Sequence, residues 1–388
     1  MHLERLELVD WRSYARAELD FAPGVRVIVG ANAQGKTNLL EAVHYLAIGA
    51  SHRVSTDVPL VREGAEAAVI RAVARLSDPD QDAAADAGQR LSVELEIRPQ
   101  GRNRAQLNGQ PQPRVREAIG RIRSVLFAPE DLALVRGDPA ERRRFLDELL
   151  GQRRPAYLAA RQEYERVLRQ RNALLKQVRA GAADPADLAI WTDALAASGS
   201  GLLAARIAAV HALAAPVAEA YADLVSDSPQ REASGAVRLV YELSTGRAVA
   251  AEPGAGTPDP AGLADELREA LARLAPAERE RGITLAGPHR DELFLGLKDL
   301  PAKGYASHGE HWSLALALRL ASREVLREVG EEPVVLLDDV FAELDEERRR
   351  RLADRCAGFT QVLVTAAVDG DVPLAGPRTH VHAGTVAA

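Results

Sequence analysis

The feature that most constrains this chain is a glycine-rich segment near its beginning, GANAQGKT at residues 30–37. Gly30, Gly35, Lys36 and Thr37 match the pattern G-x-x-x-x-G-K-[ST], in which backbone N–H groups surround phosphates, the lysine reaches them and the hydroxyl faces a magnesium ion. The segment follows the apolar run VRVIV and precedes KTNLLEAVHYLAI, whose apolar residues recur with helical spacing. This order predicts an α/β fold with a nucleotide site formed by Gly30, Ala31, Asn32, Ala33, Gln34, Gly35, Lys36, Thr37 and Asn38.

The rest of the first third of the chain has the pattern of strands. Alternating apolar and polar residues at 2–14 and 17–24 predict two strands ahead of the glycine-rich segment, and 67–76 and 89–99 predict a further pair. The acidic, alanine-rich residues inside that pair predict a flexible tip. Asn108-Gly109 is typical of a tight turn. We therefore expect a mixed α/β lobe.

The composition is that of a globular protein, with 47% hydrophobic and 27% charged residues. No apolar run is long enough to predict a transmembrane helix, and the charged beginning, MHLERLELVDW, does not have the pattern of a signal peptide. The single cysteine, Cys356, cannot form an internal disulfide. We therefore expect a cytoplasmic protein with no membrane partner.

Charge is unevenly distributed along the chain. The formal net charge is -7, which taken alone argues against a nucleic-acid partner. Residues 98–179, however, are strongly basic and arginine-rich, so the remainder is more acidic than the total indicates. A local basic face can attract a phosphate backbone, and arginines on solvated helices explain the same pattern. Charge alone leaves both interpretations open.

The middle of the chain is predicted to be helical. Apolar residues with a 3-4 spacing, interrupted by Arg171, predict one helix with a coiled-coil-like seam at Tyr157, Ala160, Tyr164, Val167, Leu174 and Val178. Asp184-Pro185 is typical of a new helix start, and a comparable seam follows at Leu188, Trp191, Leu195, Leu202 and Ala205. These two helices predict an antiparallel hairpin.

A strand at 236–243, a Gly/Pro-rich loop at 247–262 and an amphipathic helix at 263–282 are expected to follow the hairpin. Strand-like composition resumes near residue 283. The chain is therefore predicted to consist of an α/β head at residues 1–129 and 283–388 and an inserted, mostly helical arm at residues 130–282.

A second element of the nucleotide site is predicted near the end of the chain. Val334 to Leu337 has the pattern of a buried parallel strand, and two carboxylates, Asp338 and Asp339, follow it. Asp338 would hold magnesium together with Thr37, and Asp339 would polarise the attacking water. Lys36 and Asp339 are therefore the predicted catalytic residues, and Thr37 and Asp338 the predicted metal ligands.

A third element is the turn that precedes a long amphipathic helix. The hydroxyl of Ser307, the N–H groups near Gly309 and the helix dipole predict an anion site at the start of this helix. Two phosphate-binding helix starts in one chain are expected if the second faces the nucleotide of a neighbouring subunit.

Taken in order, these motifs resemble those of the ABC-type ATPase superfamily. Gly30–Thr37 resembles its Walker A loop, residues 307–311 its signature turn, residues 336–339 its Walker B strand and residues 343–345 its D-loop. The resemblance implies that two heads bind ATP between them, with the signature serine of one reaching the γ-phosphate held by the other. It also implies that Asp345 lies at this nucleotide interface.

Within that superfamily the chain resembles the RecF family of bacterial recombination mediators. The stretches at 123–150, 170–177 and 285–293 carry the likeness. It implies a protein that binds DNA, ATP and Mg²⁺, forms a homodimer with ATP, and works with RecR and RecO to help RecA load at gapped DNA. The chain departs from ABC heads in having Asp339 in place of glutamate and Thr365 near the expected switch histidine, which predicts a weak, DNA-stimulated ATPase that acts as a switch.

Several single residues have two interpretations. Arg12 could contact the nucleotide or be exposed, and Arg53 could contact phosphate or DNA. Arg142 to Arg144 could contact DNA or form a basic turn that opens a helix. His289 to Asp291 could couple arm to head or form a local hydrogen-bond cluster. His308 and His311 are not expected to bind metal, because no third ligand is close in sequence.

The alternative functions are an SMC-like structural or nuclease-associated ATPase head and a transporter ATPase subunit. The former would need hundreds of coiled-coil residues and a hinge. The latter would need a membrane partner and a short helical subdomain in place of the arm.

Overall fold

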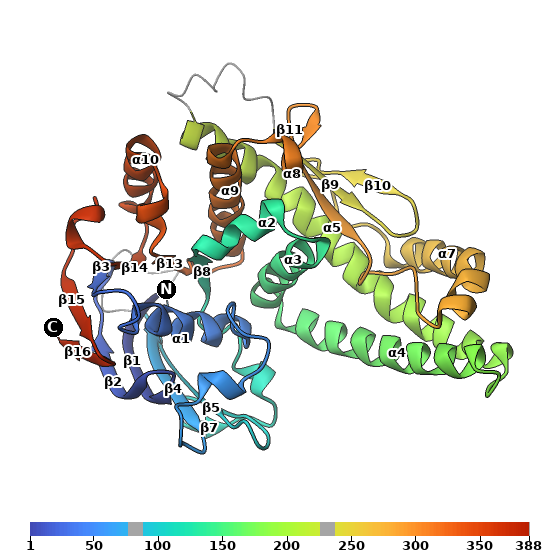
Figure 1. Cartoon of the computed structure of the whole chain (residues 1–388), viewed down its shortest axis with the longest axis horizontal. Coiled ribbons are helices and arrows are strands. Elements are labelled where there is room, and N and C mark those ends of the chain that lie inside the picture. Colours follow the sequence, from blue (N-terminus) through green and yellow to red (C-terminus); the bar gives the residue numbers. More distant parts are fainter. Residues whose placement is uncertain (77–87, 226–236, 388) are drawn as a thin grey trace. The chain divides into compact units, whose positions relative to one another are not determined.

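The computed structural model describes residues 1–76, 88–225 and 237–387 (Figure 1). They group into two compact units, the first comprising Met1–Asp131, Asp223–Ser226 and Arg319–Ala388 and the second Leu132–Ala222 and Asp227–Leu318. The flexible tip expected after residue 76 lies almost entirely outside the described residues.

The first unit contains an antiparallel sheet in the order β2-β1-β4-β5-β6-β7. Leu3, Leu6 and Leu8 are fully buried, as the alternation of β1 predicts. Asn108 and Gly109 have φ of 48° and 75°, so the predicted tight turn between β6 and β7 is confirmed. The strands of this sheet are β1 (His2–Trp11), β2 (Tyr14–Asp20), β4 (Ala68–Arg75), β5 (Arg90–Ile97), β6 (Arg104–Leu107) and β7 (Gln110–Pro111).

A second sheet of the first unit has the order β16-β15-β3-β14-β13-β8. Its strands β15, β3, β14, β13 and β8 run parallel, which brings their carboxyl ends to one edge. Val334 to Leu337 are fully buried, as predicted for a parallel strand. The strands are β3 (Gly24–Val29), β8 (Ser124–Phe127), β13 (Val334–Asp338), β14 (Gln361–Ala366), β15 (Arg378–His382) and β16 (Thr385–Ala387).

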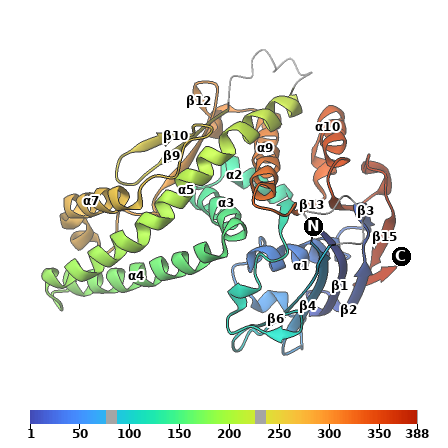
Figure 2. The same ribbon diagram turned by 180° about the vertical axis from the view of Figure 1, so that it is seen from behind.

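Helix α1 (Lys36–Ile48) contacts strands of both sheets (Figure 2). Leu39, Leu40 and Val43 are buried on the predicted apolar face, and Glu41 and His44 are buried too. The helix is therefore enclosed on more than one side, because a sheet covers each of two faces. Helix α10 (Glu346–Cys356) follows β13 in the same unit.

The second unit is mostly helical. Its helices are α2 (Leu132–Arg136), α3 (Pro139–Arg153), α4 (Pro155–Arg179), α5 (Leu188–Val225), α7 (Pro260–Arg281), α8 (Ala302–Tyr305) and α9 (His308–Arg327). The last residues of α5 and the second half of α9 belong to the first unit. The predicted helix start after the break is confirmed, since the Asp184 side chain accepts a hydrogen bond from the N–H of Ala186.

The predicted seam of α4 is partly wrong. Ala160 is exposed and Leu174 is only half-buried, whereas Leu175 is fully buried. Arg171, expected to interrupt the seam, is 2% exposed. Helix α4 contacts α7 as well as α5. Arg171 therefore pairs with the carboxylate of Glu278 on α7 and donates a hydrogen bond to Thr192 on α5 instead of continuing an apolar seam.

A four-stranded sheet of order β10-β9-β11-β12 completes the second unit. Part of the predicted Gly/Pro-rich loop is a strand, β10 (Ala248–Ala250), because it pairs with the predicted strand β9 (Val237–Glu242). The other strands are β11 (Glu292–Leu297) and β12 (Leu300–Pro301). The predicted boundary at residue 283 falls inside this unit, because β11 pairs with β9 along its whole length.

One helix is longer and more apolar than the sequence analysis predicted. The segment Pro185–Val225, which includes α5, is long and apolar enough to cross a membrane by length and composition, with a hydropathy of 1.6. Leu202, Ile207 and Leu213 are fully buried inside the protein, as in the core helix of a soluble unit. The expectation that no such run exists is corrected, and burial in a core explains the composition.

Candidate nucleotide and metal site

The glycine-rich loop lies between the end of β3 and the start of α1, as its sequence predicts. At Gly30 a Cβ would lie 2.4 Å from the carbonyl oxygen of Val381. Gly35 has φ of 114°, and a Cβ there would lie 2.8 Å from the Tyr14 hydroxyl. Both positions therefore require glycine, one for close approach and the other also for its left-handed backbone.

The C-terminal hairpin supports the loop. The Gln34 side chain accepts a hydrogen bond of 2.7 Å from the N–H of Ala383, and the Gln34 carbonyl accepts one of 3.3 Å from Gly384. No local pattern predicts this contact between residues 349 positions apart. The loop is consequently held from outside its own strand and helix.

Lys36 lies at the centre of the predicted catalytic group. Its ammonium donates to the carbonyl of Ala31 at 3.4 Å and lies 3.9 Å from Oδ2 of Asp339. The side chain is 4% exposed, so its charge is directed into the loop. A buried cation inside a ring of backbone N–H groups is suited to bind phosphate oxygens.

Asp338, the predicted metal ligand, ends β13 beside the start of α1. Its Oδ1 accepts hydrogen bonds from the hydroxyl of Thr37 at 3.0 Å and from that of Thr365 at 2.6 Å. The structure thus brings together Thr37 and Asp338, although 301 positions separate them in the chain.

Burial governs the protonation of Asp338. The pKa of this carboxyl is raised to about 6, chiefly by loss of solvent and also by the nearby charges of Asp339 and Glu130, while the two hydroxyl hydrogen bonds act in the opposite direction. A buried carboxylate of this kind is stabilised by a cation. A hydroxyl and a carboxylate are oxygen ligands of the type magnesium prefers, and magnesium commonly takes one or two carboxylates with the rest of its shell from phosphate and water. The residues present fit such an ion.

Asp339 differs from Asp338 in exposure and backbone. Its side chain is 34% exposed and its φ is 50°, in the left-handed region. Its N–H donates to the Thr365 hydroxyl at 2.9 Å. An accessible carboxylate near a phosphate-binding lysine can polarise a water, which is compatible with the predicted role.

Arg12 and Arg53, both considered as nucleotide contacts, converge on a buried carboxylate that sequence reasoning missed. The Arg12 guanidinium forms two hydrogen bonds with Glu41, at 2.8 and 2.5 Å, and Arg53 lies 3.6 Å from the same group. Ser51 donates to Glu41 as well. The only sequence signal was a glutamate on an otherwise apolar stretch of helix. Arg12 as a cofactor contact stays a prediction.

Asn38, predicted as a nucleotide contact, bridges neighbouring loops. Its amide donates to Ser13 at 3.0 Å and accepts from Arg53 at 2.9 Å. Asp345, predicted at the nucleotide interface, caps α10 by accepting from the N–H of Arg348 at 2.9 Å. These hydrogen bonds do not test whether Asn38 or Asp345 binds the nucleotide, so both roles stay predictions.

The predicted anion site in the second unit is a reciprocal cap at the start of α9. The Ser307 hydroxyl accepts from the N–H of Glu310 at 3.3 Å, and the Glu310 carboxylate accepts from the N–H of Ser307 at 2.7 Å. Arg136 donates to His311 at 3.1 Å and lies 2.9 Å from His308. The cap orders the turn that holds Ser307 and Gly309.

Most arginines considered for DNA contact have structural partners in the second unit. Arg142, 6% exposed, forms two hydrogen bonds with Glu292, and Arg143 donates to the carbonyl of Asp291. For Arg142 the DNA interpretation is corrected, because burial and a carboxylate already satisfy its charge.

The cluster around His289 and Asp291 is also local. Asp291 accepts from Ser244 and Tyr241, and His289 lies 2.6 Å from the Tyr164 hydroxyl. All of these residues belong to the second unit, which favours the interpretation as a local hydrogen-bond cluster.

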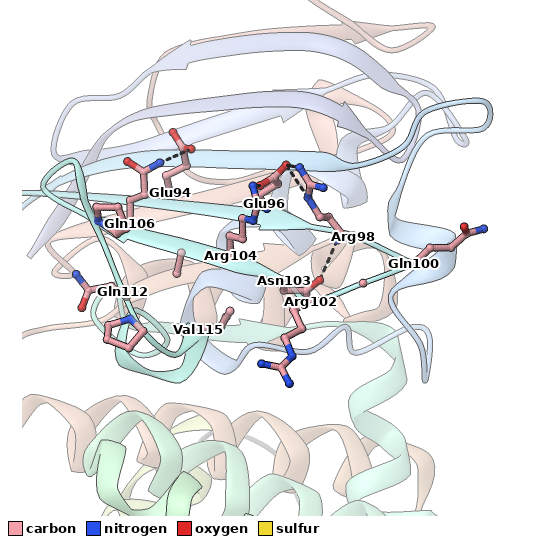
Figure 3. Close-up of a pocket in the computed structure, with 14 residues that line it drawn as sticks. Glu94, Glu96, Arg98, Gln100, Arg102, Asn103, Arg104, Gln106, Gln112 and Val115 are labelled. Carbon is pink, nitrogen blue, oxygen red and sulfur yellow. Dashed lines mark hydrogen bonds and ion pairs between the residues drawn. The ribbon is translucent and has the colours of Figure 1, made fainter.

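A polar pocket of about 730 Å³ lies at β5, β6 and β7, formed by residues other than those predicted for the nucleotide (Figure 3). Arg98, Arg102 and Arg104 line it together with Glu94 and Glu96. Glu96 pairs with Arg98 and lies 3.8 Å from Arg104, so two of the three cations share one carboxylate. This part of the basic stretch is therefore less positive than its sequence indicates.

Comparisons with known proteins assign the family. A family profile described as the RecF/RecN/SMC N terminal domain matches residues 2–378. Two curated relatives, both named DNA replication and repair protein RecF, are 52% identical to this chain, one from Streptomyces avermitilis over 395 residues and one from Frankia alni over 393. Each alignment covers 100% of this chain and 99% of the relative. The chain belongs to the RecF family.

Solved structures agree with this assignment. A structure of the recombination mediator protein RecF with ATP, described as part of the RecFOR pathway, superposes with a TM-score of 0.86 at 26% identity, over 100% of this chain and 97% of that one. An SMC head bound to the C-winged helix domain of ScpA superposes with a TM-score of 0.53 at 19% identity, which concerns the fold alone. The predicted RecF resemblance and the predicted ATPase-head fold with a helical insertion are both confirmed.

Proposed function

We propose that this RecF-family protein binds ATP and Mg²⁺ at Gly30–Thr37 and Asp338, and that it uses the nucleotide as a switch in DNA replication and repair. The observation that carries the proposal is the convergence of the glycine-rich loop, Lys36, Thr37 and Asp338 at one edge of the parallel sheet. Bound magnesium would neutralise phosphate charge. Lys36 would hold the phosphates, and Asp339 would orient a water for slow hydrolysis.

Two copies of the chain would form the complete site. Ser307 and Gly309 would face the γ-phosphate held by a second subunit, with Asp345 at the same interface. The supporting observation is the reciprocal cap between Ser307 and Glu310, which orders this helix start, and a helix start of this kind favours an anion through its dipole. Because the contact depends on the γ-phosphate, ATP would favour the homodimer and hydrolysis would release it.

DNA would bind to the dimer through phosphate contacts that do not read sequence. Arg102 and Arg169 are exposed, and across residues 1–76, 88–225 and 237–387 no ion pair is found for either, so both are better candidates than Arg142. The chain would work with RecR and RecO in the cytoplasm to help RecA load at gapped DNA. Its similarity to a RecF structure described as part of the RecFOR pathway supports a place in that pathway. The chain would then be a DNA-binding ATPase with an inserted domain.

Sedimentation of two variants tests the proposal. Lys36→Met should lose ATP-dependent dimerisation, because the γ-phosphate is no longer held. Ser307→Arg should keep nucleotide binding in the monomer and lose dimerisation, because the side chain acts on the other subunit's ATP. Lys176→Met, an exposed lysine of α4, is the matched control and should behave as the wild type. A Lys36→Met protein that dimerises with ATP as strongly as the wild type would contradict the switch.

A further inference from the structure

We propose that Thr365 is a positioning residue that holds the metal aspartate Asp338 and the backbone of Asp339 in one geometry. The inference rests on the proposed ATP and magnesium site and adds a residue to it.

The sheet places Thr365 beside the site. Strands β13 and β14 run parallel, and Asp338 and Thr365 are register partners. Thr365 is 1% exposed. Its neighbours along β14, Val364 and Ala366, are buried and apolar, so the strand itself does not call for a polar side chain here. A hydroxyl is costlier to bury than a methyl group unless it is hydrogen-bonded, so its partners indicate its role.

The Thr365 hydroxyl acts both as a hydrogen-bond donor and as an acceptor at the site. It donates its single proton to Oδ1 of Asp338 at 2.6 Å, and its oxygen accepts from the N–H of Asp339 at 2.9 Å. Each bond polarises the other, so the pair is stronger than two separate contacts. One side chain on β14 thereby links the metal carboxylate to the backbone of the residue that would orient water.

The other hydroxyl on Asp338 belongs to Thr37, which is itself a proposed magnesium ligand. Thr365 is not a proposed magnesium ligand, so its hydroxyl can hold the Asp338 carboxylate whether or not the metal is bound. Groups of this kind behind a metal ligand commonly change metal affinity by roughly 10- to 100-fold when removed.

The backbone of Asp339 needs this support. A non-glycine residue with φ of 50° is strained unless its surroundings hold it there. The bond from its N–H to Thr365 is one such restraint. Removing the hydroxyl would therefore loosen the direction of the Asp339 carboxylate as well as that of Asp338.

The test is the magnesium dependence of nucleotide binding, measured with a fluorescent ATP analogue on the full chain. Thr365→Val keeps shape and strand propensity and removes both hydrogen bonds. The magnesium concentration for half-maximal binding should rise roughly 10- to 100-fold, while binding in EDTA stays unchanged. Thr365→Ser should restore the wild-type value to within roughly threefold. Thr379→Val removes another buried threonine hydroxyl, on β15 of the same sheet, and should leave the value unchanged.

The outcomes separate cleanly. An unchanged half-maximal magnesium concentration in Thr365→Val, or an equal rise in Thr379→Val, overturns the inference while leaving the nucleotide site in place. A wild-type protein whose nucleotide binding ignores magnesium overturns the proposed site itself. If Thr365→Val does not fold, Thr365→Ala is measured against Thr365→Ser under the same criteria, with Mn²⁺ binding followed by electron paramagnetic resonance as the second readout.

Discussion

At the scale of single residues, Asp338 combines two demands that oppose each other. It must be buried at the carboxyl end of β13 to reach Thr37, and it must be ionised to hold magnesium. Burial raises its pKa to about 6 from 3.8. The folded protein without metal therefore binds a proton here more tightly than the unfolded chain, so ionisation of this group lowers stability as pH rises from about 3.8 to about 6.

Asp338→Asn should consequently stabilise the metal-free protein above pH 6. The amide oxygen can still accept from both threonine hydroxyls, and no buried charge remains. We expect a gain in the free energy of unfolding of about 3 kcal/mol at neutral pH that disappears near pH 4. Urea unfolding in EDTA across this pH range measures it, with the exposed Asp20→Asn as control. A difference that does not vary with pH would contradict the linkage.

At the scale of elements, helix α4 is attached to its surroundings by charge as well as by apolar packing. Arg171 donates to Glu278 on α7 at 2.7 Å, to Thr284 at 2.9 Å and to Thr192 on α5 at 3.2 Å. Glu278 in turn accepts from the N–H of Leu285 at 2.7 Å. The pair is fully buried and hydrogen-bonded on both sides, which is the arrangement in which removing one partner leaves an uncompensated charge.

Arg171→Ala should therefore be strongly destabilising, by about 3–5 kcal/mol. Arg166→Ala on the same helix removes an exposed pair with Glu163 and should cost far less, because solvent screens that pair. Arg171→Met combined with Glu278→Gln should lose less than the sum of the two single changes, since no unpaired charge remains. Urea midpoints followed by circular dichroism give these values, and equal losses for Arg171→Ala and Arg166→Ala would refute the buried-pair argument.

At the scale of the whole molecule, the residues proposed for one ATP are divided between two compact units. The glycine-rich loop and Asp338 belong to the first, and Ser307 to the second. The function proposed here pairs the first unit of one chain with the second unit of another, so that neither copy has a complete site alone. Mixing two variants, each defective in a different unit, tests directly whether one ATP site is shared between two chains.

Lys36→Met and Ser307→Arg should each lack ATP-dependent dimerisation and ATPase activity when alone, and regain part of both when mixed. The mixed dimer contains one site with an intact loop from the Ser307→Arg copy and an intact Ser307 from the Lys36→Met copy. Light scattering and phosphate release on the mixture measure the recovery. Absence of recovery at every ratio, with both proteins folded, would show that Ser307 acts within its own chain.

The sequence by itself determined the elements whose signals are local. The glycine-rich loop, the buried strand ahead of Asp338, the Asn108-Gly109 turn and the helix start at Asp184 each depend on residues within a few positions of one another, and each lies where its pattern predicts. The family likeness could also be predicted, since it is a likeness of sequence.

Only the tertiary structure decided which distant residues meet. Thr365 lies beside Asp338 because β14 pairs in register with β13, and Ala383 holds Gln34 because the C-terminal hairpin lies next to β3. Arg171 is buried because α7 supplies a carboxylate, which no periodicity within α4 can signal. Strand register and helix packing join residues hundreds of positions apart, and the free energy of those contacts depends on burial, which a local pattern does not contain.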